Sequence, residues 1–423
     1  MAIQKITSGI LADGAIVAAD IANGSITTAK IADGNVTSAK IDTVANTKIT
    51  GLVTSGQIAN VANTQITGSI EATQVGTTVS QLFGMRNRII NGAMEIDQRN
   101  AGASVTVSAS GVASVDRFTG YCQQATGAFT MQQSTTVPTL TSGAFTNSLL
   151  FTVTNTTAPG STNRVLLRQI IEGLNVADFG WGTSSATTIT LSFWVRSSII
   201  GTYGVGFINS AENRSYVGTY TINSANTWEQ KSITVAGDTT GTWLTNNSNG
   251  IRVAFDLGSG TGYNASSANT WVAQEACRTS SCVNWQQNSG ATFYITGVQL
   301  ELGSSATPFE RRQYGQELAL CQRYFQTVAN GPSGASNLTT SCLFGFQFPV
   351  VMRTAPSSAV TGAIRVSDIS TSAFTQSSGT ISNNLVTPDG GSFILGNFTG
   401  MTINRPILLA QLSTGTIQLS AEL

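Results

Sequence analysis

An aliphatic residue recurs at every fifth position near the start of the chain, and no other feature constrains the fold as strongly. The members of this ladder are Ile6, Leu11, Ile16, Ile21, Ile26, Ile31, Val36 and Ile41. A period of five fits neither an α-helix, with about 3.6 residues per turn, nor a strand, whose side chains alternate. From Leu11 onward, the residue two positions before each aliphatic is glycine or alanine. Such regularity is typical of repeat architectures, whose units must stack to bury their apolar side.

Three structures are compatible with this repeat. A single chain winding as a pentapeptide-type β-helix would complete only about two coils, whereas solenoids need roughly three or more stacked repeats. A flexible linker would explain the glycine and serine content but not the aliphatic register. Three copies that share one narrow core bury every aliphatic residue against its symmetry mates. We therefore predict a thin, β-rich, homotrimeric stalk over residues 1–84.

The composition excludes several classes of function. The 423 residues include no histidine, which removes histidine-based triads, HExxH metal sites and imidazole catalysis. Only 10% are charged, with 21 basic and 21 acidic residues, and the few lysines are scattered, so we expect no nucleic-acid partner. There is no 18-residue apolar run and no hydrophobic signal segment at the start, so we expect no membrane insertion.

The five cysteines are irregularly spaced, which is neither a disulfide framework nor a zinc pattern. We expect free, buried thiols, with a small Cys277–Cys282 disulfide loop as the alternative.

Strand signals dominate the centre of the chain. Over 188–196, apolar and other residues alternate, so that Ile189 and Phe193 fall on one face and Trp194 and Arg196 on the other. Further strands are expected at 148–154, 165–171, 204–208, 228–235, 250–257 and 292–300. Many short strands with almost no helical period predict an antiparallel jelly-roll sandwich over residues 85–312.

Several motifs in this region occur in a family-like order. They lie at 87–99 (Asn-Arg-Ile-Ile-Asn-Gly-Ala-Met-Glu-Ile-Asp-Gln-Arg), 114–118, 293–303, 306–312 and 314–324. Together they resemble the jelly-roll domains of bacteriophage tail-fibre and adhesin proteins, over roughly residues 85–325. The resemblance implies a virion fibre, assembled in the cytoplasm of a bacterial host, whose N-terminal stalk docks to phage tail or baseplate proteins.

The segment Asn-Gly-Ala-Met-Glu at 91–95, together with Val-Gln-Leu-Glu at 298–301, is also similar to carbohydrate-binding modules of jelly-roll type. Such modules often hold a structural calcium ion, an oxygen-seeking cation. The resemblance makes Glu95 a candidate calcium ligand, although the partner aspartate of the family pattern is missing, because Thr296 and Gly297 stand at that place. The alternative is a hydrogen-bonded carboxylate at a strand edge. We expect no other cofactor.

Aromatic residues in polar, turn-like settings are candidate ligand-binding groups. Trp243, Tyr263, Trp271 and Trp285 have such surroundings, and exposed loop aromatics often bind ligands. Flat rings suit the C–H faces of sugars, so these four predict a site for a bacterial surface glycan. The alternative is that they close sandwich edges or oligomer seams. Trp194 and Trp228 lie within expected strands and are predicted to pack.

A catalytic interpretation requires two carboxylates. Glu95 and Asp97 would share one face of a strand at a separation of about 6–7 Å, which suits glycoside hydrolysis in principle. A solvent-facing pair is the commoner arrangement of alternating acids, so we predict that the chain is not an enzyme.

Residues 313–423 are expected to form one short helix and a small β domain. Thr-Pro-Phe-Glu at 307–310 predicts a capping box, and Tyr314, Leu318, Cys321 and Phe325 predict one apolar stripe. Strands are expected at 341–351, 363–369, 392–398 and 407–419. The loops at 333–337 and 388–391 are rival candidates for receptor binding.

The sequence thus predicts an all-β virion fibre that attaches to its host by binding a cell-surface glycan without cleaving it. A purely structural decoration of the phage head or tail and a glycan depolymerase are the alternatives.

Overall fold

The computed structural model describes residues 17–22, 25, 27 and 85–423, except for 108–110, 124–128, 141–143, 329–331, 369–372, 377–379 and 411–414. The chain divides into two compact units, Met1–Glu71 and Ala72–Leu423. Within the first unit, Ala18–Asp20 form a short 3-10 turn. Of the ladder residues, Ile21 alone is among the described residues, so the trimeric stalk stays a prediction.

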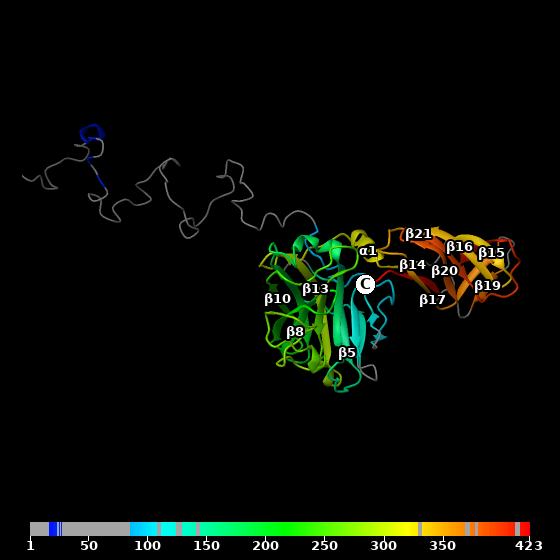
Figure 1. Ribbon diagram of the computed structural model, residues 1–423, viewed down its shortest axis with the longest axis horizontal. Coiled ribbons are helices and arrows are strands. Elements are labelled where there is room, and N and C mark those ends of the chain that lie inside the picture. Colours follow the sequence, from blue (N-terminus) through cyan, green and yellow to red (C-terminus); the bar gives the residue numbers. More distant parts are fainter. Residues whose placement is uncertain are drawn as a thin grey trace, which may run out of the picture. The chain divides into compact units, whose positions relative to one another are not determined.

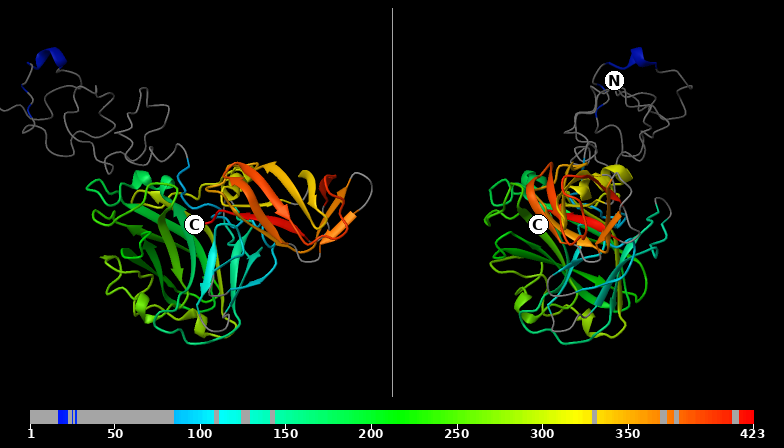
Figure 2. Two further views of the ribbon diagram at one scale, coloured as in Figure 1. Left: turned by 45° about the vertical axis from the view of Figure 1, so that its right-hand side comes forward. Right: turned by 90° about the vertical axis from the view of Figure 1, so that its right-hand side faces the viewer.

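Residues 105–302 form a sandwich of two antiparallel sheets, coloured cyan to yellow-green in Figure 1. Sheet A has the order β1 (Val105–Thr106), β4 (Phe129–Ser134), β5 (Ser148–Val153), β13 (Thr292–Leu302), β7 (Ile189–Ser197) and β10 (Glu229–Val235). Sheet B has the order β12 (Trp271–Val272), β9 (Ser215–Ile222), β8 (Gly201–Ile208), β11 (Asn249–Asp256), β6 (Val165–Glu172), β3 (Thr119–Cys122) and β2 (Val112–Ala113). This is the predicted jelly-roll sandwich, seen from two further directions in Figure 2.

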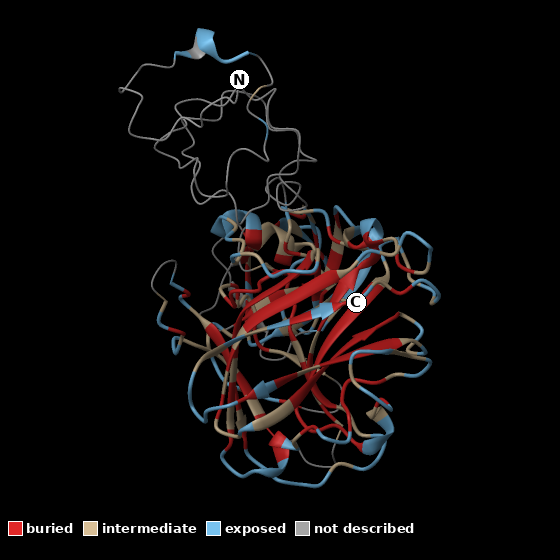
Figure 3. Ribbon diagram, turned by 90° about the vertical axis from the view of Figure 1, so that its left-hand side faces the viewer, coloured by how far each residue is buried: buried red, intermediate tan, exposed pale blue. Residues whose placement is uncertain are grey.

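Alternation along the strands builds the core between these sheets. On β7, Leu191, Phe193 and Val195 are fully buried, as the 188–196 pattern predicted. Their neighbours Phe293 on β13 and Phe255 on β11 join the same apolar cluster. The buried strands therefore appear red along most of their length in Figure 3.

The outer face of sheet B is covered by the chain between 257 and 285. Ala254 and Ile208 of the sheet pack against Cys277 of this segment, and Val217 packs against Ala276. The strand glycines Gly204 and Gly206 leave no room for a Cβ beneath the Ala276 and Cys277 backbone. Sheet B therefore presents little of its outer face to solvent.

The C-terminal part contains the helix α1 (Tyr314–Gln322) and two antiparallel sheets. The small sheet has the order β14 (Phe325–Val328), β23 (Thr416–Ser420), β17 (Ser357–Thr361). The larger has β19 (Ala373–Gln376), β18 (Ile364–Asp368), β22 (Pro406–Ala410), β15 (Ser333–Leu338), β16 (Ser341–Gln347), β21 (Gly390–Leu395) and β20 (Ile381–Thr387). An all-β fold with one α-helix is thus confirmed for the described residues.

Three local predictions in this part were wrong. The strand expected at 407–419 is two strands, β22 and β23, which belong to different sheets. The capping box does not form, because α1 begins only at Tyr314 and the Glu310 carboxylate accepts the backbone N–H groups of Arg86 and Asn87 instead. The apolar stripe is also incomplete, since Tyr314 is 61% exposed and Phe325 belongs to β14.

All five cysteines are buried, and none forms a disulfide. Within the described residues, no helix is long and apolar enough to cross a membrane.

Candidate functional site

Trp285 is a core residue, so the expectation of an exposed binding ring at this position was wrong. Its side chain is 0% exposed and packs edge-on against Phe129 and Phe151. The indole N–H donates to the Thr292 carbonyl at 3.2 Å. The short 3-10 turn Trp285–Gln287 directs the ring inward. The polar residues next to Trp285 in the sequence had indicated an exposed loop instead.

Trp243 and Trp271 meet at one end of the sandwich, together with Trp181. Ring centroids lie 4.8 to 5.5 Å apart in edge-on geometry. The N–H of Trp243 donates to Asp238 at 3.1 Å, and that of Trp271 to the Ala236 carbonyl at 3.0 Å. Both rings are half-buried and serve packing here, so glycan binding by them stays a prediction.

Tyr263 is the fourth predicted residue, and it lies apart from that cluster. It packs on the outer side of sheet B, where its hydroxyl donates to the Thr162 carbonyl at 3.0 Å. The Arg164 guanidinium lies 5.5 Å from the ring centroid. The structure therefore brings together only two of the four predicted aromatics.

A different set of aromatic and amide side chains crosses the outer face of sheet A. Tyr294 on β13 is paired with Leu150 on β5 and with Arg196 on β7, and Gln132 on β4 lies opposite Leu150. We call Gln132, Leu150, Tyr294, Arg196 and Trp228 the aromatic row.

Contacts between rings and guanidinium hold this row together. Trp228, which directly precedes β10, lies edge-on to Tyr294 with centroids 6.0 Å apart. The Arg196 guanidinium is 4.9 Å from the Tyr294 centroid, and its Nε donates to the Asn226 carbonyl at 2.9 Å. All five side chains are half-buried, so each keeps some surface exposed to solvent.

Along β13, the aromatic row lies on the open part of this face. Beyond Tyr294, the outward residues Thr296, Gln299 and Glu301 are buried. The segment around 307–308 covers Gln299 and Glu301, since Gln299 Nε2 and Glu301 both bond to Thr307. The sequence pattern had placed Trp194 and Arg196 on one face, but it could not show which strands pair beside them or which part stays open.

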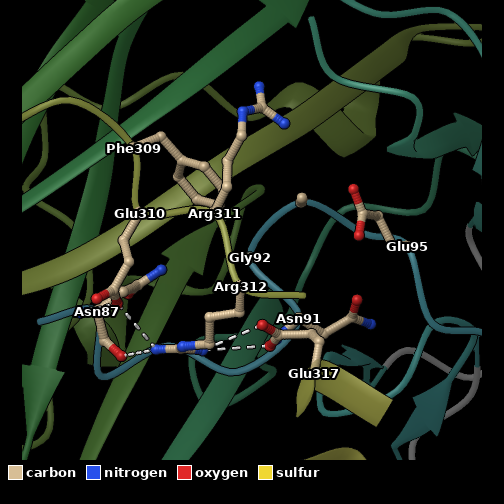
Figure 4. A pocket seen from close by; sticks show the side chains of 10 residues that line it. Asn87, Asn91, Gly92, Glu95, Phe309, Glu310, Arg311, Arg312 and Glu317 are labelled. Atoms are coloured by element: carbon tan, nitrogen blue, oxygen red, sulfur yellow. Dashed lines mark hydrogen bonds and ion pairs between the residues drawn. The ribbon is translucent and has the colours of Figure 1, made fainter. Parts of the chain in front are cut away.

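A pocket of about 120 Å³ lies on this same side of the sandwich, where the two ends of the domain meet (Figure 4). Its walls are Asn87, Asn91, Gly92, Ala93, Glu95, Phe309, Glu310, Arg311, Arg312 and Glu317. Figure 4 shows the Glu95 carboxylate and the Arg311 guanidinium on opposite sides of it. The Arg311 guanidinium lies over the Phe145 and Phe309 rings, at 4.8 and 5.9 Å. We call this the Glu95–Arg311 pocket.

Burial raises the pKa of Glu95, and the neighbouring Glu317 raises it further, while the Arg311 guanidinium and a hydrogen bond from Thr146 act in the opposite direction. The carboxylate is therefore partly removed from water, and its interactions with Arg311 and Thr146 do not fully offset that loss of hydration.

These surroundings do not fit a calcium site at Glu95. The charged partner that lowers its pKa is a guanidinium of the chain itself. Thr296, at the place of the family aspartate, offers a hydroxyl in place of a second carboxylate and donates it to the Asn147 carbonyl at 2.7 Å. In the part of the chain that is described, no three His, Cys, Asp or Glu side chains are grouped to hold a metal.

The expectation that Glu95 and Asp97 share a strand face was also wrong. The backbone from 91 to 97 is irregular, with positive φ at Asn91 (60°) and Met94 (59°). Asp97 accepts the backbone N–H groups of Asn100 and Gly102 at 2.8 and 2.6 Å and so stabilises a turn. The two acids therefore serve different local structures.

Residues of the family-like motifs link the segment that precedes the sandwich to its last strand, β13, and to the residues that follow it. The Asn87 side chain donates to the Val298 carbonyl at 3.0 Å and accepts the N–H groups of Ile89 and Leu300. The Asn87 backbone is held in turn by Glu310 and Arg312. We call Asn87, Glu310 and Arg312 the corner. These motif residues are therefore structural.

Comparison with known proteins gives fold likeness only. No protein-family model matches the chain, and no curated protein matches it. Among solved structures, the enzymatically active domain of bacteriophage CBA120 tailspike protein 4 is 14% identical, with a TM-score of 0.27. The match covers 51% of this chain but only 21% of the tailspike chain.

Two carbohydrate-binding modules are also similar. One is TmCBM61 in complex with β-1,4-galactotriose, at 11% identity and a TM-score of 0.25, over 52% of this chain and all of that one. The other is the family 11 module of a Clostridium thermocellum cellulosomal cellulase, at 12% identity and a TM-score of 0.23, over 49% of this chain and all of that one.

Proposed function

We propose that the chain is a bacteriophage virion fibre whose sandwich binds a bacterial surface glycan without cleaving it. The observation that carries this proposal is the aromatic row on the open part of sheet A. Aromatic faces flanked by an arginine and a glutamine suit the C–H faces and hydroxyl groups of sugars. The fibre assignment draws support from the motif resemblance over residues 85–325.

The remaining parts of this proposal rest on the aliphatic ladder, for the trimer, and on the same resemblance, for the docking and the location. Three copies share the N-terminal ladder, the stalk docks to phage tail or baseplate proteins, and the protein resides in the virion. Multivalency then turns weak sugar contacts into useful avidity.

The test is binding of the full chain to polysaccharide from candidate host cells, followed by isothermal titration calorimetry. Trp228→Ala should weaken binding about 5–30-fold, because truncating a central aromatic contact typically costs about 1–2 kcal/mol. Trp243→Ala serves as the comparison, since its ring packs against Trp181. If Trp243→Ala weakens binding and Trp228→Ala does not, the glycan site lies at the cluster of Trp181, Trp243 and Trp271 instead.

The two alternatives give different outcomes in the same assay. A structural decoration binds no polysaccharide from any host that the phage infects. A depolymerase shortens the polysaccharide, which size-exclusion chromatography after incubation detects, and Glu95→Gln would abolish that shortening. We expect intact chains.

A further inference from the structure

We propose that the Glu95–Arg311 pocket receives the hydroxyl-bearing edge of a terminal, neutral sugar residue of the glycan. The inference rests on the proposed function, because it assigns a second subsite to the same ligand.

The chemistry of the two facing groups selects the ligand class. A carboxylate only accepts hydrogen bonds, and a guanidinium only donates them. A sugar hydroxyl does both, so two neighbouring hydroxyls can bridge Glu95 and Arg311. Because the charges of Glu95 and Arg311 are opposite, the pair gives no net attraction to an anion or to a cation, which favours a neutral ligand.

The size of the pocket limits what enters. Its volume of about 120 Å³ is well below the roughly 300–1,000 Å³ of pockets that enclose drug-sized ligands. One edge of a single residue fits, and the rest of a glycan must lie outside.

The position of the pocket links it to the aromatic row. Ala93 lines the pocket, and its carbonyl oxygen lies 3.5 Å from Thr296 Oγ1. Thr296 lies two residues beyond Tyr294 on β13, or about 7 Å along the strand. A glycan of a few residues on the aromatic row can therefore reach the pocket with its end.

The wall that carries Glu95 is rigidly held. The Asn91 side chain donates to the Ile96 carbonyl at 2.8 Å and accepts the Ile96 N–H at 2.9 Å. Gly92 packs so closely on the Val298 carbonyl that no Cβ fits. Positive φ at two non-glycine residues, Asn91 and Met94, is a conformation that persists only where surrounding structure enforces it. The backbone that carries Glu95 is thus held in place before any ligand arrives.

The experiment uses the full chain, host polysaccharide and the methyl glycosides of neutral hexoses as single-residue probes. Glu95→Gln and Arg311→Gln should each weaken polysaccharide binding about tenfold and abolish competition by the methyl glycosides. Trp228→Ala should weaken polysaccharide binding but retain methyl-glycoside binding in saturation-transfer NMR. Arg365→Gln, at an exposed arginine of β18, is the matched control and should change neither.

The failures are distinguishable. If the wild-type chain binds no host polysaccharide, the proposed function and the pocket assignment both fall. If it binds and Glu95→Gln, Arg311→Gln and Arg365→Gln bind equally well, only the pocket assignment falls. Calcium chloride binding that Glu95→Gln abolishes, with glycan binding unchanged, would make the pocket a cation site and overturn the inference. Arg311 is exposed, so its variant tests the pocket even if Glu95→Gln unfolds.

Discussion

Glu172, the last residue of β6, shows how one buried carboxylate joins the sandwich to the residues after α1. It is 1% exposed and accepts two bonds from Arg323, at 2.6 and 2.9 Å, and one from the Tyr324 hydroxyl at 2.7 Å. Because hydrogen bonds to charged groups each contribute about 1.5–3 kcal/mol, Glu172→Gln, which keeps one acceptor oxygen but loses the charge, should lower the free energy of unfolding by about that amount. Urea denaturation at pH 7 measures it.

The same residue predicts a pH dependence. Burial acts to raise the pKa of Glu172, but the bonds from Arg323 and Tyr324 outweigh it, so the pKa lies below its ordinary value. The stabilisation is therefore complete above the ordinary glutamate pKa of about 4.3 and is lost as the pH falls through the lowered folded value. The difference in melting temperature between wild type and Glu172→Gln should shrink from pH 7 to pH 3. A difference that stays constant would contradict this assignment.

Residue by residue, the sequence predicted burial better than it predicted the site. Alternation on β7 identified Leu191 and Phe193 as core, because one face of a strand must be apolar. Local polarity misplaced Trp285, because a side chain's direction depends on the turn that carries it. Trp228 was expected to pack, and only the pairing of β5, β13 and β7 reveals that its neighbours form an open surface.

At the scale of elements, β8 depends on glycine beneath the segment that covers sheet B. Gly206→Ala places a Cβ against the Ala276 carbonyl and Cys277, and such overpacking typically costs about 1–3 kcal/mol. We expect a lower melting temperature and faster reaction of Cys277, now 1% exposed, with a thiol reagent. Gly345→Ala on β16 is the control, because its Cβ would meet no atom closer than 3.9 Å. Equal effects of both substitutions would count against this packing role.

At the scale of the whole molecule, the aliphatic ladder should determine the number of copies. In the single chain Ile21 is 43% exposed, and association would bury it. Sedimentation of the full chain should give three times 44.1 kDa. Replacing Ile16, Ile21, Ile26 and Ile31 with serine should give single copies whose sandwich melts at the wild-type temperature. A monomeric wild-type chain would contradict the prediction of a trimer.

The corner also sets the path of force through this part of the chain. Tension that enters at Arg86 and leaves beyond Arg312 passes through the short chain of bonds from Asn87 to Glu310 and Arg312. These bonds lie between the two points of loading, so the mechanical path bypasses the strands of both sheets. A load applied between these two points would therefore strain this junction first, while both sheets keep their shape.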